Sequence, residues 1–254
     1  MPRPRRLLFP GDSYHVYDRG NNRQRIFLDD KDCTIFMGKA FKYAEECKVQ
    51  IHTWVVMPNH FHFFVTPLTH KGLSHFMQYL KAAYGYHFNT RYERTGTIWE
   101  SRYCSLPVQS TRYALHIYRY IELNPVRAGL VRGPRQYHWS SYHTNARGVP
   151  SGGLTPHPAY RLLGIDEDER LHNYRELVRE AGGTEKSMYE AQVHLINTAQ
   201  KHLAAYGDEE FHKSLCARTG LKYWHLQKVL DTCSEEGADT EMLKLAQQVV
   251  KGMI

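Results

Sequence analysis

Short apolar segments interrupted by turn-forming residues dominate the first half of the chain. Four of them are rich in Val, Ile, Phe, Trp or Tyr, the residues that pack well on a pleated sheet surface, and this composition predicts strands. The predicted strands cover residues 13–17, 50–56, 60–65 and 98–106. A Gly- and Asn-rich turn at 18–23 follows the first strand, and Met57-Pro58 separates the two central strands.

Three longer segments of the same half are predicted to be helices. The first begins at Asp29 or Asp30 and runs to about Cys47, and the second spans about 72–92, each with an apolar face at helical spacing. The third begins at Ser110 and reaches Leu123. We expect Asn124-Pro125 to end it, because the residue before a proline disfavours the α conformation.

The resulting order β-α-β-β-α-β-α is that of a ferredoxin-like split βαβ unit. We therefore predict an α+β fold over residues 1–148, with an antiparallel sheet that has helices on one face. Trp139 to Tyr142 should pack back on this domain. The Gly, Pro, Ser and Thr residues of 149–160 predict a linker.

The remaining residues, 161–254, predict a helical C-terminal region. Within it, the pattern of residues 211–230 predicts two short helices around Gly220. This pattern fits a helix-turn-helix and an ordinary small helical bundle equally well.

Composition narrows the class of protein. The 254 residues are 42% hydrophobic, which suffices for a real core, and no apolar run approaches the length of a membrane span. No signal-peptide core follows the basic N-terminus. The five cysteines are odd in number, widely spaced and without a C-x-x-C pair, which argues against a disulfide framework or a zinc ribbon and for a reducing cytoplasm.

The net charge of +7 is unevenly distributed. Residues 1–134 hold 19 Lys/Arg against 10 Asp/Glu, a net +9, whereas residues 135–254 hold 14 against 16, a net −2. Many of the 18 tyrosines lie among the arginines of the first half. Basic side chains interleaved with aromatic rings suit phosphate neutralisation and base stacking, so we expect a nucleic-acid partner.

Two histidines of one predicted strand are candidate metal ligands. His60 and His62 are two residues apart, so both project from the same face of the strand, while Phe61 and Phe63 project from the opposite face. Neutral imidazole binds Mn, Zn, Co or Ni and tolerates Mg. An isolated His-x-His is nevertheless often incidental.

Tyr120 and Asn124 supply the matching chemistry downstream. They are four residues apart and therefore stack on one face of the third helix. An amide oxygen beside two imidazoles could complete a site for a divalent ion, and a phenol could act as a covalent nucleophile. Tyr120 could instead be a core aromatic residue. Tyr113 and Tyr118 are nearby alternatives, but neither has an amide four residues on.

These segments resemble a known family. Pro58-Asn59-His60-Phe61-His62 is similar to the His-hydrophobic-His (HUH) motif, and the run from Tyr120 to Leu130 is similar to the single-tyrosine (Y1) motif of IS200/IS605-type transposases. Arg19 to Arg23, together with Gly96-x-x-Trp99-x-x-Arg102-Tyr103, resembles the subfamily of REP-associated tyrosine transposases. The similar segments cover residues 10–142.

The resemblance implies metal-dependent cleavage and rejoining of single-stranded DNA at hairpin-flanked sites. It implies Tyr120 as the nucleophile that forms a 5′-phosphotyrosine, and His60, His62 and Asn124 as ligands of Mg²⁺ or Mn²⁺. IS200-type sequences often have Gln where Asn124 stands. Two other hypotheses remain open, a domesticated hairpin-binding protein that no longer cuts and a metal phosphoesterase without covalent catalysis.

Further expectations concern the DNA and the cell. The partner should be single-stranded or hairpin DNA with REP-like palindromes, bound by a monomer or a homodimer in the bacterial cytoplasm, in association with the nucleoid. We expect DNA contacts from Arg19, Asn22, Arg23, Lys81 and Arg102.

Overall fold

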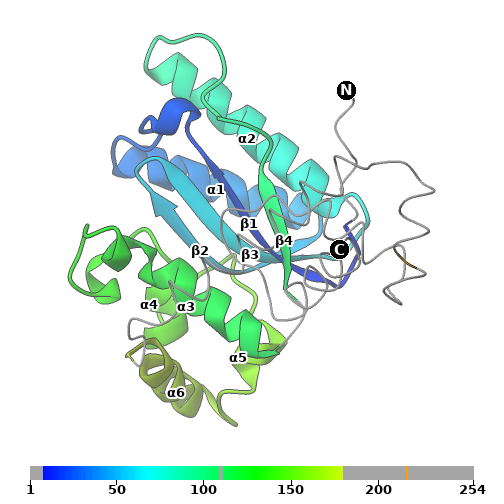
Figure 1. Ribbon diagram of the computed structural model, residues 1–254, viewed down its shortest axis with the longest axis vertical. Coiled ribbons are helices and arrows are strands. Elements are labelled where there is room, and N and C mark those ends of the chain that lie inside the picture. Colours follow the sequence, from blue (N-terminus) through cyan, green and yellow to red (C-terminus); the bar gives the residue numbers. More distant parts are fainter. Residues whose placement is uncertain (1–7, 109–110, 180–215, 217–254) are drawn as a thin grey trace.

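The computed structural model describes residues 8–108, 111–179 and 216, and in it a four-stranded antiparallel sheet separates two layers of helices (Figure 1). The strand order is β2-β3-β1-β4, and every neighbouring pair is antiparallel. This is the topology of a split βαβ unit, so the predicted fold class is confirmed. The strands are β1 (Ser13–Arg19), β2 (Val49–Met57), β3 (His60–Pro67) and β4 (Cys104–Val108).

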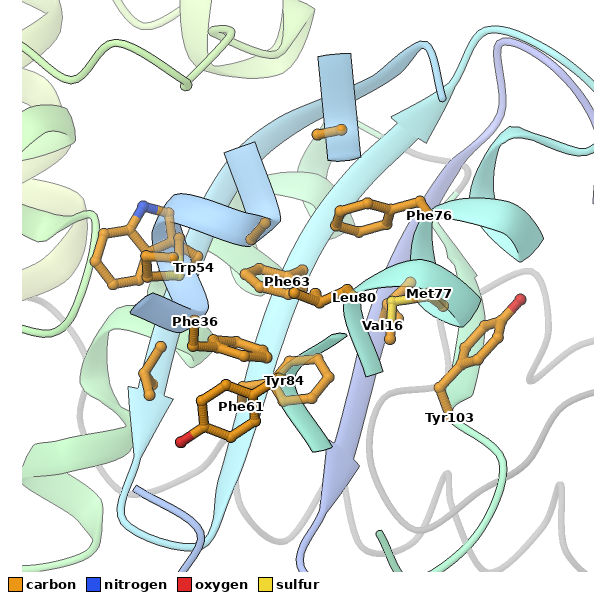
Figure 2. Close-up of a cluster of buried hydrophobic side chains, with 14 of the residues drawn as sticks. Val16, Phe36, Trp54, Phe61, Phe63, Phe76, Met77, Leu80, Tyr84 and Tyr103 are labelled. Atoms are coloured by element: carbon orange, nitrogen blue, oxygen red, sulfur yellow. The ribbon is translucent and has the colours of Figure 1, made fainter. Parts of the chain in front are cut away.

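Helices α1 (Asp30–Glu46) and α2 (Gly72–Arg91) cover one face of the sheet. The Asp29 side chain caps α1 by accepting a hydrogen bond from the Asp32 amide, as its position before the apolar run suggests. Phe61 and Phe63 of β3 point into this layer and pack against Phe36 of α1, with ring centroids 5.0 and 6.0 Å away. Figure 2 shows this aromatic core between the sheet and the two helices.

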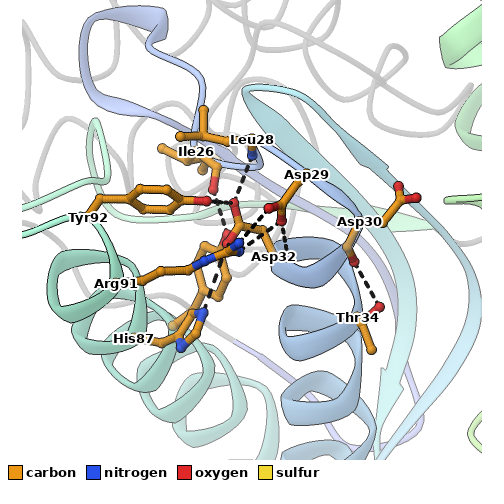
Figure 3. Close-up of polar contacts among 10 residues, drawn as sticks. Ile26, Leu28, Asp29, Asp30, Asp32, Thr34, His87, Arg91 and Tyr92 are labelled. Atoms are coloured by element: carbon orange, nitrogen blue, oxygen red, sulfur yellow. Dashed lines mark hydrogen bonds and ion pairs between the residues drawn. The ribbon is translucent and has the colours of Figure 1, made fainter.

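A polar network joins the beginning of α1 to the end of α2 (Figure 3). The guanidinium of Arg91 donates to the carboxylates of both Asp29 and Asp32, and the Tyr92 hydroxyl donates to Asp32 over 2.8 Å. Asp32 is fully buried, so each of these hydrogen bonds offsets the cost of removing its carboxylate from water. Arg91 thus has a structural role.

The opposite face of the sheet is covered as well, which differs from our expectation of helices on one face. Here lie α3 (Thr111–Arg127), α4 (Tyr142–Arg147), α5 (Pro158–Arg161) and α6 (Glu167–Arg179). The physical reason is that β2 and β3 are apolar on both faces. Val55 and Phe64 are fully buried in a second hydrophobic cluster with residues of these helices.

Helix α3 continues past the predicted stop, and Pro125 lies within it. The proline is in the last turn, so its missing N–H interrupts the helix only near its end. The helix then ends in a Schellman motif at Gly129, whose φ is +69°. In that motif the Leu130 amide donates to the Pro125 carbonyl, and the Gly129 amide donates to the Val126 carbonyl.

Strand β4 begins at Cys104, six residues after the predicted start at Ile98. The contacts of Trp99 explain why the strand begins later. Its buried indole donates from Nε1 to the Lys81 carbonyl of α2, and its backbone forms only an isolated bridge to Gly20. The Asn21 amide donates to the Ile98 carbonyl and the Glu100 amide donates to the Arg19 carbonyl, so the chain around Trp99 is held both to the end of β1 and to α2 before β4 begins.

The segment 149–160, predicted to be a linker, is folded against the sheet. Leu154 forms a bridge to Ile51, and the Thr155 amide donates to the Ile51 carbonyl. Gly153 lies so close to Phe41 that an added Cβ would be 2.0 Å from Cδ1 of the ring. The small residues that suggested a linker instead permit close packing. Trp139 to Ser141 pack on the outer edge of β2, as predicted, with the Val56 amide donating to the Trp139 carbonyl.

The predicted C-terminal region, 161–254, is described only to Arg179 and at Cys216. The helix-turn-helix candidate at 211–230 therefore lies outside the described residues except for Cys216. Among the helices that the structure describes, none is long and apolar enough to cross a membrane.

The buried His52 and the half-buried His157 anchor the segment 155–159 through a chain of hydrogen bonds. The carbonyl of Thr155 can only accept, so His52 Nδ1 donates to it over 2.7 Å. Neutral His52 must then accept at Nε2, and it does so from the Thr66 hydroxyl at 2.8 Å. This assignment fixes the direction of every bond that follows.

The hydrogen bonds continue through Ser13 of β1 and return to the segment 155–159. The Ser13 hydroxyl donates to Thr66, 2.7 Å away, and His157 Nε2 donates to Ser13 over 3.0 Å. His157 Nδ1 is thereby left to accept from the Ala159 amide at 3.1 Å. We call this chain the histidine relay. Every group in it is satisfied only when both imidazoles are neutral.

A buried carboxylate holds α3 to the neighbouring elements. Glu122 is fully buried and accepts hydrogen bonds from Thr53 of β2, from Ser141 and Asn145, and from Tyr174 of α6. Their lengths are 3.1, 2.6, 2.8 and 2.6 Å. Burial raises the pKa of Glu122, and these four hydrogen bonds oppose that rise.

We predict that Tyr174→Phe destabilises the fold by about 1–3 kcal/mol, because it leaves one oxygen of the buried Glu122 carboxylate without its donor. Urea unfolding followed by circular dichroism measures the change. Tyr86→Phe removes the same hydroxyl from a ring that is 76% exposed and serves as the control. Equal stability of the two variants would contradict the role of Tyr174.

The histidine relay predicts that acid destabilises the protein. Burial lowers the pKa of His52 to about 3 and that of His157 to about 4. Between these values and the ordinary pKa of about 6.5, only the unfolded chain takes up the proton, so stability falls as the pH falls from about 6.5 towards 4.

Denaturant unfolding at a series of pH values tests this expectation. Each histidine contributes a slope of up to about 1.4 kcal/mol per pH unit inside that window. His52→Gln cannot titrate and should flatten the slope, whereas His75→Gln, at an exposed position on α2, should not. An unaltered slope in His52→Gln would show that the relay does not control the acid response.

Candidate active site between strand β3 and helix α3

The two histidines of β3 project from one face of the sheet, as predicted. His60 and His62 lie on the α3 side, with ring centroids 5.1 Å apart and planes at 89°, while Phe61 and Phe63 point into the core under α1 and α2. His62 is buried and His60 is half-buried. The site is therefore at the surface on the His60 side and closed on the His62 side.

Asn124 of α3 lies between the two imidazoles. Its Oδ1 is 3.4 Å from Nε2 of His60, and its Nδ2 is 3.4 Å from Nε2 of His62. The structure thus brings together the three residues that the sequence predicted as metal ligands. Both histidines present the same ring nitrogen, Nε2, to the amide.

The other ring nitrogen of His60 fixes its tautomer. Nδ1 is 2.6 Å from Oδ1 of Asn59, while Nδ2 of Asn59 donates to the Arg23 carbonyl over 3.2 Å. Because that carbonyl accepts only, Asn59 must present its oxygen to His60, whose Nδ1 therefore carries the hydrogen. Nε2 of His60 is left with a free lone pair that faces Asn124.

His15 of β1 plays the corresponding part for His62. His15 Nε2 is 2.9 Å from His62 Nδ1, and the rings stack at 5.1 Å. The Asn124 amide donates to His62 Nε2, so His62 Nδ1 carries the hydrogen and donates to His15. Desolvation by burial lowers the pKa of all three imidazoles, to about 3 for His15 and about 4 for His60, and well below 6.5 for His62.

This donor set fits a divalent cation. At neutral pH all three histidines are uncharged, and neutral imidazole is the form that binds metals. His60 Nε2 and Asn124 Oδ1 are both acceptors and face each other at 3.4 Å, an arrangement that a cation would stabilise. Among the described residues no group of three or more His, Cys, Asp or Glu could hold a metal ion by itself, and the amide oxygen of Asn124 is a further donor beside the two imidazoles.

Tyr120 lies one helical turn before Asn124 and packs its ring against the histidines. Its centroid is 5.5 Å from His62 and 5.6 Å from His15, both edge-to-face. The ring is half-buried, and the guanidinium of Arg127 lies over it at 5.0 Å. The nucleophile candidate is therefore beside the candidate ligands within one chain.

Tyr118 occupies the opposite environment. It is fully buried among Phe64, Tyr160 and Tyr174, and its hydroxyl accepts from the His157 amide at 3.1 Å. Burial raises its pKa far above the ordinary value. Tyr118 is thus a core residue, while the side chain of Tyr113 lies outside the described residues.

The segment that carries these side chains matches a family of known proteins. Residues 11–124 fit the family model described as "Transposase IS200 like". This segment of the chain is similar to that family. Both the His60/His62 pair and the Tyr120/Asn124 pair fall within this IS200-like segment, which confirms the resemblance seen in the sequence.

Two solved structures are similar to the chain. A REP-associated tyrosine transposase bound to a REP hairpin shares 23% identity over 63% of this chain and 96% of its own, with a TM-score of 0.49. A candidate transposase from Deinococcus radiodurans shares 20% identity over 48% of this chain and 96% of its own, with a TM-score of 0.34. No curated protein sequence matches the chain.

The five predicted DNA contacts fall into two groups in the structure. Arg19 is paired with Glu100 and lies opposite His60 in the β1–β3 register. Asn22 and Arg23 are exposed on the loop that Asn59 ties to His60. These three residues border the candidate site.

Lys81 lies away from the candidate site. Lys81 belongs to α2, on the other side of the sheet, where it pairs with the buried Asp18 and lies over the Trp99 ring. Alternation along β1 turns Asp18 away from the site while Arg19 faces it. Arg102 is exposed in the loop before β4.

Four residues of the site were not predicted from the sequence. His15 and Tyr17 alternate on the predicted first strand, so the same period-two rule could have placed both on one face, and the Tyr17 ring is indeed 5.4 Å from His62. Asn59 lies within the histidine motif. Arg127 lies within the tyrosine motif, one turn beyond Asn124, where helical spacing points to the same face as Tyr120.

His15→Phe should weaken Mn²⁺ binding about 10- to 100-fold, because His62 loses the acceptor that holds its tautomer and ring orientation. Phenylalanine keeps the ring packing against Tyr17 and Tyr120. Electron paramagnetic resonance of free Mn²⁺ measures the affinity without DNA or turnover. His75→Phe, at an exposed position, is the matched control, and equal affinity of the two variants would exclude His15 from the site.

Proposed function

We propose that this protein is a metal-dependent single-stranded DNA transposase that cleaves and rejoins DNA at hairpin-flanked sites through a 5′-phosphotyrosine on Tyr120. The observation that carries the proposal is the position of Asn124. On one helix it is a turn away from the half-buried Tyr120, and across the interface its amide contacts Nε2 of both His60 and His62. A core packing role would not require this convergence.

The chain's own groups account for the proposed reaction. The Tyr120 oxygen attacks the phosphorus of a phosphodiester in single-stranded DNA, which forms a tyrosine–phosphate bond and breaks the bond to the 3′ oxygen. The DNA strand on the leaving side gains a 3′-OH. A second 3′-OH can then attack the phosphotyrosine and restore both the phosphodiester and the phenol, so rejoining requires no nucleotide cofactor.

His60, His62 and Asn124 would hold Mg²⁺ or Mn²⁺, with Asn59 and His15 orienting the two imidazoles. The ion would polarise the scissile phosphate and offset the charge that develops on it. Arg127, which lies over the Tyr120 ring, is placed to favour a negatively charged phenol or phosphate there. Arg19 and the loop of Asn22 and Arg23 border the path of the strand on the other side.

The family and the fold support this proposal, and the proposed cellular setting follows from it. A transposase of this kind would act on DNA in the bacterial cytoplasm, associated with the nucleoid. All of the proposed ligands and the nucleophile come from one chain, so a monomer would suffice, although a homodimer is compatible with the same geometry.

Tyr120→Phe tests the proposal most directly. Phenylalanine keeps the ring contacts with His15, His62 and Arg127 but lacks the oxygen that attacks phosphorus. The variant should fold, bind hairpin DNA with unchanged affinity, form no covalent adduct and reduce cleavage and joining together to background. Denaturing gels with labelled oligonucleotides from the flanks of the gene, with mass spectrometry of the trapped peptide, give the readout.

Two controls define the result. Tyr118→Phe, in the buried neighbour on the same helix, should still form the adduct, and EDTA should abolish adduct formation until Mg²⁺ or Mn²⁺ is restored. An adduct mapped to another tyrosine would overturn the assignment. Hairpin binding by the wild type without any adduct would favour the domesticated, non-cleaving alternative.

A further inference from the structure

The chain that follows the Tyr120 motif has an unusual charge pattern. From Leu123 to Ile165 it contains no Asp or Glu, yet it carries five arginines and three histidines. The net charge of residues 135–254 is nevertheless −2, because all of their acidic residues follow Ile165. The excess of positive charge is therefore local. The five arginines are Arg127, Arg132, Arg135, Arg147 and Arg161.

Part of this charge gathers around α4. The rings of His138 and His143 stack in parallel at 5.6 Å, and Nη1 of Arg147 is 3.4 Å from Nδ1 of His143. Burial lowers the pKa of His143, and the charges of Arg147, His138 and Arg135 lower it further, which shows that these cations lie close together.

A residue of α6 completes the group. Nη1 of Arg175 donates to the Ala146 carbonyl over 2.8 Å, and the charges of Arg175, Arg147 and Arg135 all act on Tyr142. We call these residues the α4 basic cluster. Its members are Arg135, His138, His143, Arg147 and Arg175.

The three arginines of the α4 basic cluster differ from several cations of the first half. Arg19 pairs with Glu100, Lys81 with Asp18, and Arg91 with Asp29 and Asp32. In the part of the chain that the structure describes, none of the three cluster arginines forms an ion pair with a carboxylate, and all three are exposed. No carboxylate of the described residues neutralises their charge.

The cluster is separate from the candidate active site but joined to it by the chain. Arg127 lies over Tyr120 at the end of α3, and the chain then passes Arg132 to reach Arg135. Trp139 and Ser141 pair with Val56 and Trp54 on the outer edge of β2, which places the beginning of α4 at that edge. A ligand that covers both regions must be extended, as a nucleic acid is.

We propose that the α4 basic cluster binds the phosphate backbone of the duplex stem of a hairpin while the adjoining single strand enters the site of Tyr120. The inference rests on the proposed function and adds to it where the duplex lies. Exposed guanidinium groups suit phosphate oxygens. The neighbouring Tyr142 and His143 are half-buried, and the exposed His138 ring is stacked on His143, so guanidinium groups dominate the exposed surface of the cluster, which favours backbone contacts to a duplex.

Salt dependence of binding tests this assignment. We would compare the full-length wild type with Arg135→Gln/Arg147→Gln by fluorescence anisotropy over a salt series, with two probes. One is a DNA hairpin with a stem of about 10 base pairs, one helical turn, and a single-stranded flank, and the other is the flank alone.

Loss of two phosphate contacts should reduce the slope of log affinity against log salt by about 1.8 for the hairpin and leave it unchanged for the flank. Scrambling the stem sequence should give the same reduction, since backbone contacts do not read bases. Lys42→Gln/Lys48→Gln removes the same charge from exposed positions at the end of α1 and after it, and should not alter either slope.

Three outcomes would overturn the proposal. They are an unaltered hairpin slope in the arginine variant, an equal reduction with the flank alone, and an equal reduction in the lysine control. The Tyr120 adduct is measured separately on the wild type. Absence of that adduct would contradict the proposed function and would leave the salt slopes interpretable, so the two failures can be told apart.

Discussion

The candidate chemistry depends on how α3 is held against the sheet. Tyr120 and Asn124 face β3, and Glu122, between them in sequence, points to the other side of the helix. There its carboxylate accepts hydrogen bonds from β2, from the beginning and middle of α4 and from α6. Because hydrogen bonds to a buried carboxylate are directional and costly to leave unmade, they define both the depth and the rotation of the helix. The 3.4 Å contacts of Asn124 with both histidines follow from that placement.

The sequence predicted those features that depend on strict periodicity. The period of two along β3 placed His60 and His62 on one face, and the helical period placed Tyr120 and Asn124 together. It failed where tertiary contacts decide local structure. Trp99 delayed β4 by packing its indole on α2, and the single proline in the last turn of α3 was tolerated because little of the helix follows it.

Charge and composition were weaker guides than periodicity. The net +9 of the first half predicted a nucleic-acid partner, yet Lys81 and Arg91 form ion pairs with carboxylates of this protein, because a sum of charges ignores pairing. The small residues around Gly153 suggested a free linker but serve close packing against Phe41. Composition cannot distinguish these cases, because a flexible chain and a tightly packed one both favour residues without large side chains.

The histidine relay helps to define how far the folded domain of this protein extends. It starts at the Ala159 amide, passes through β1, β3 and β2, and ends at the Thr155 carbonyl, so it forms a closed ring across the sheet and the segment that covers it. A boundary drawn after α4 would cut this ring and would also separate Tyr174 from Glu122. The module that evolution or an engineer can transfer intact therefore extends through α6, some fifty residues beyond the family match that ends at Asn124.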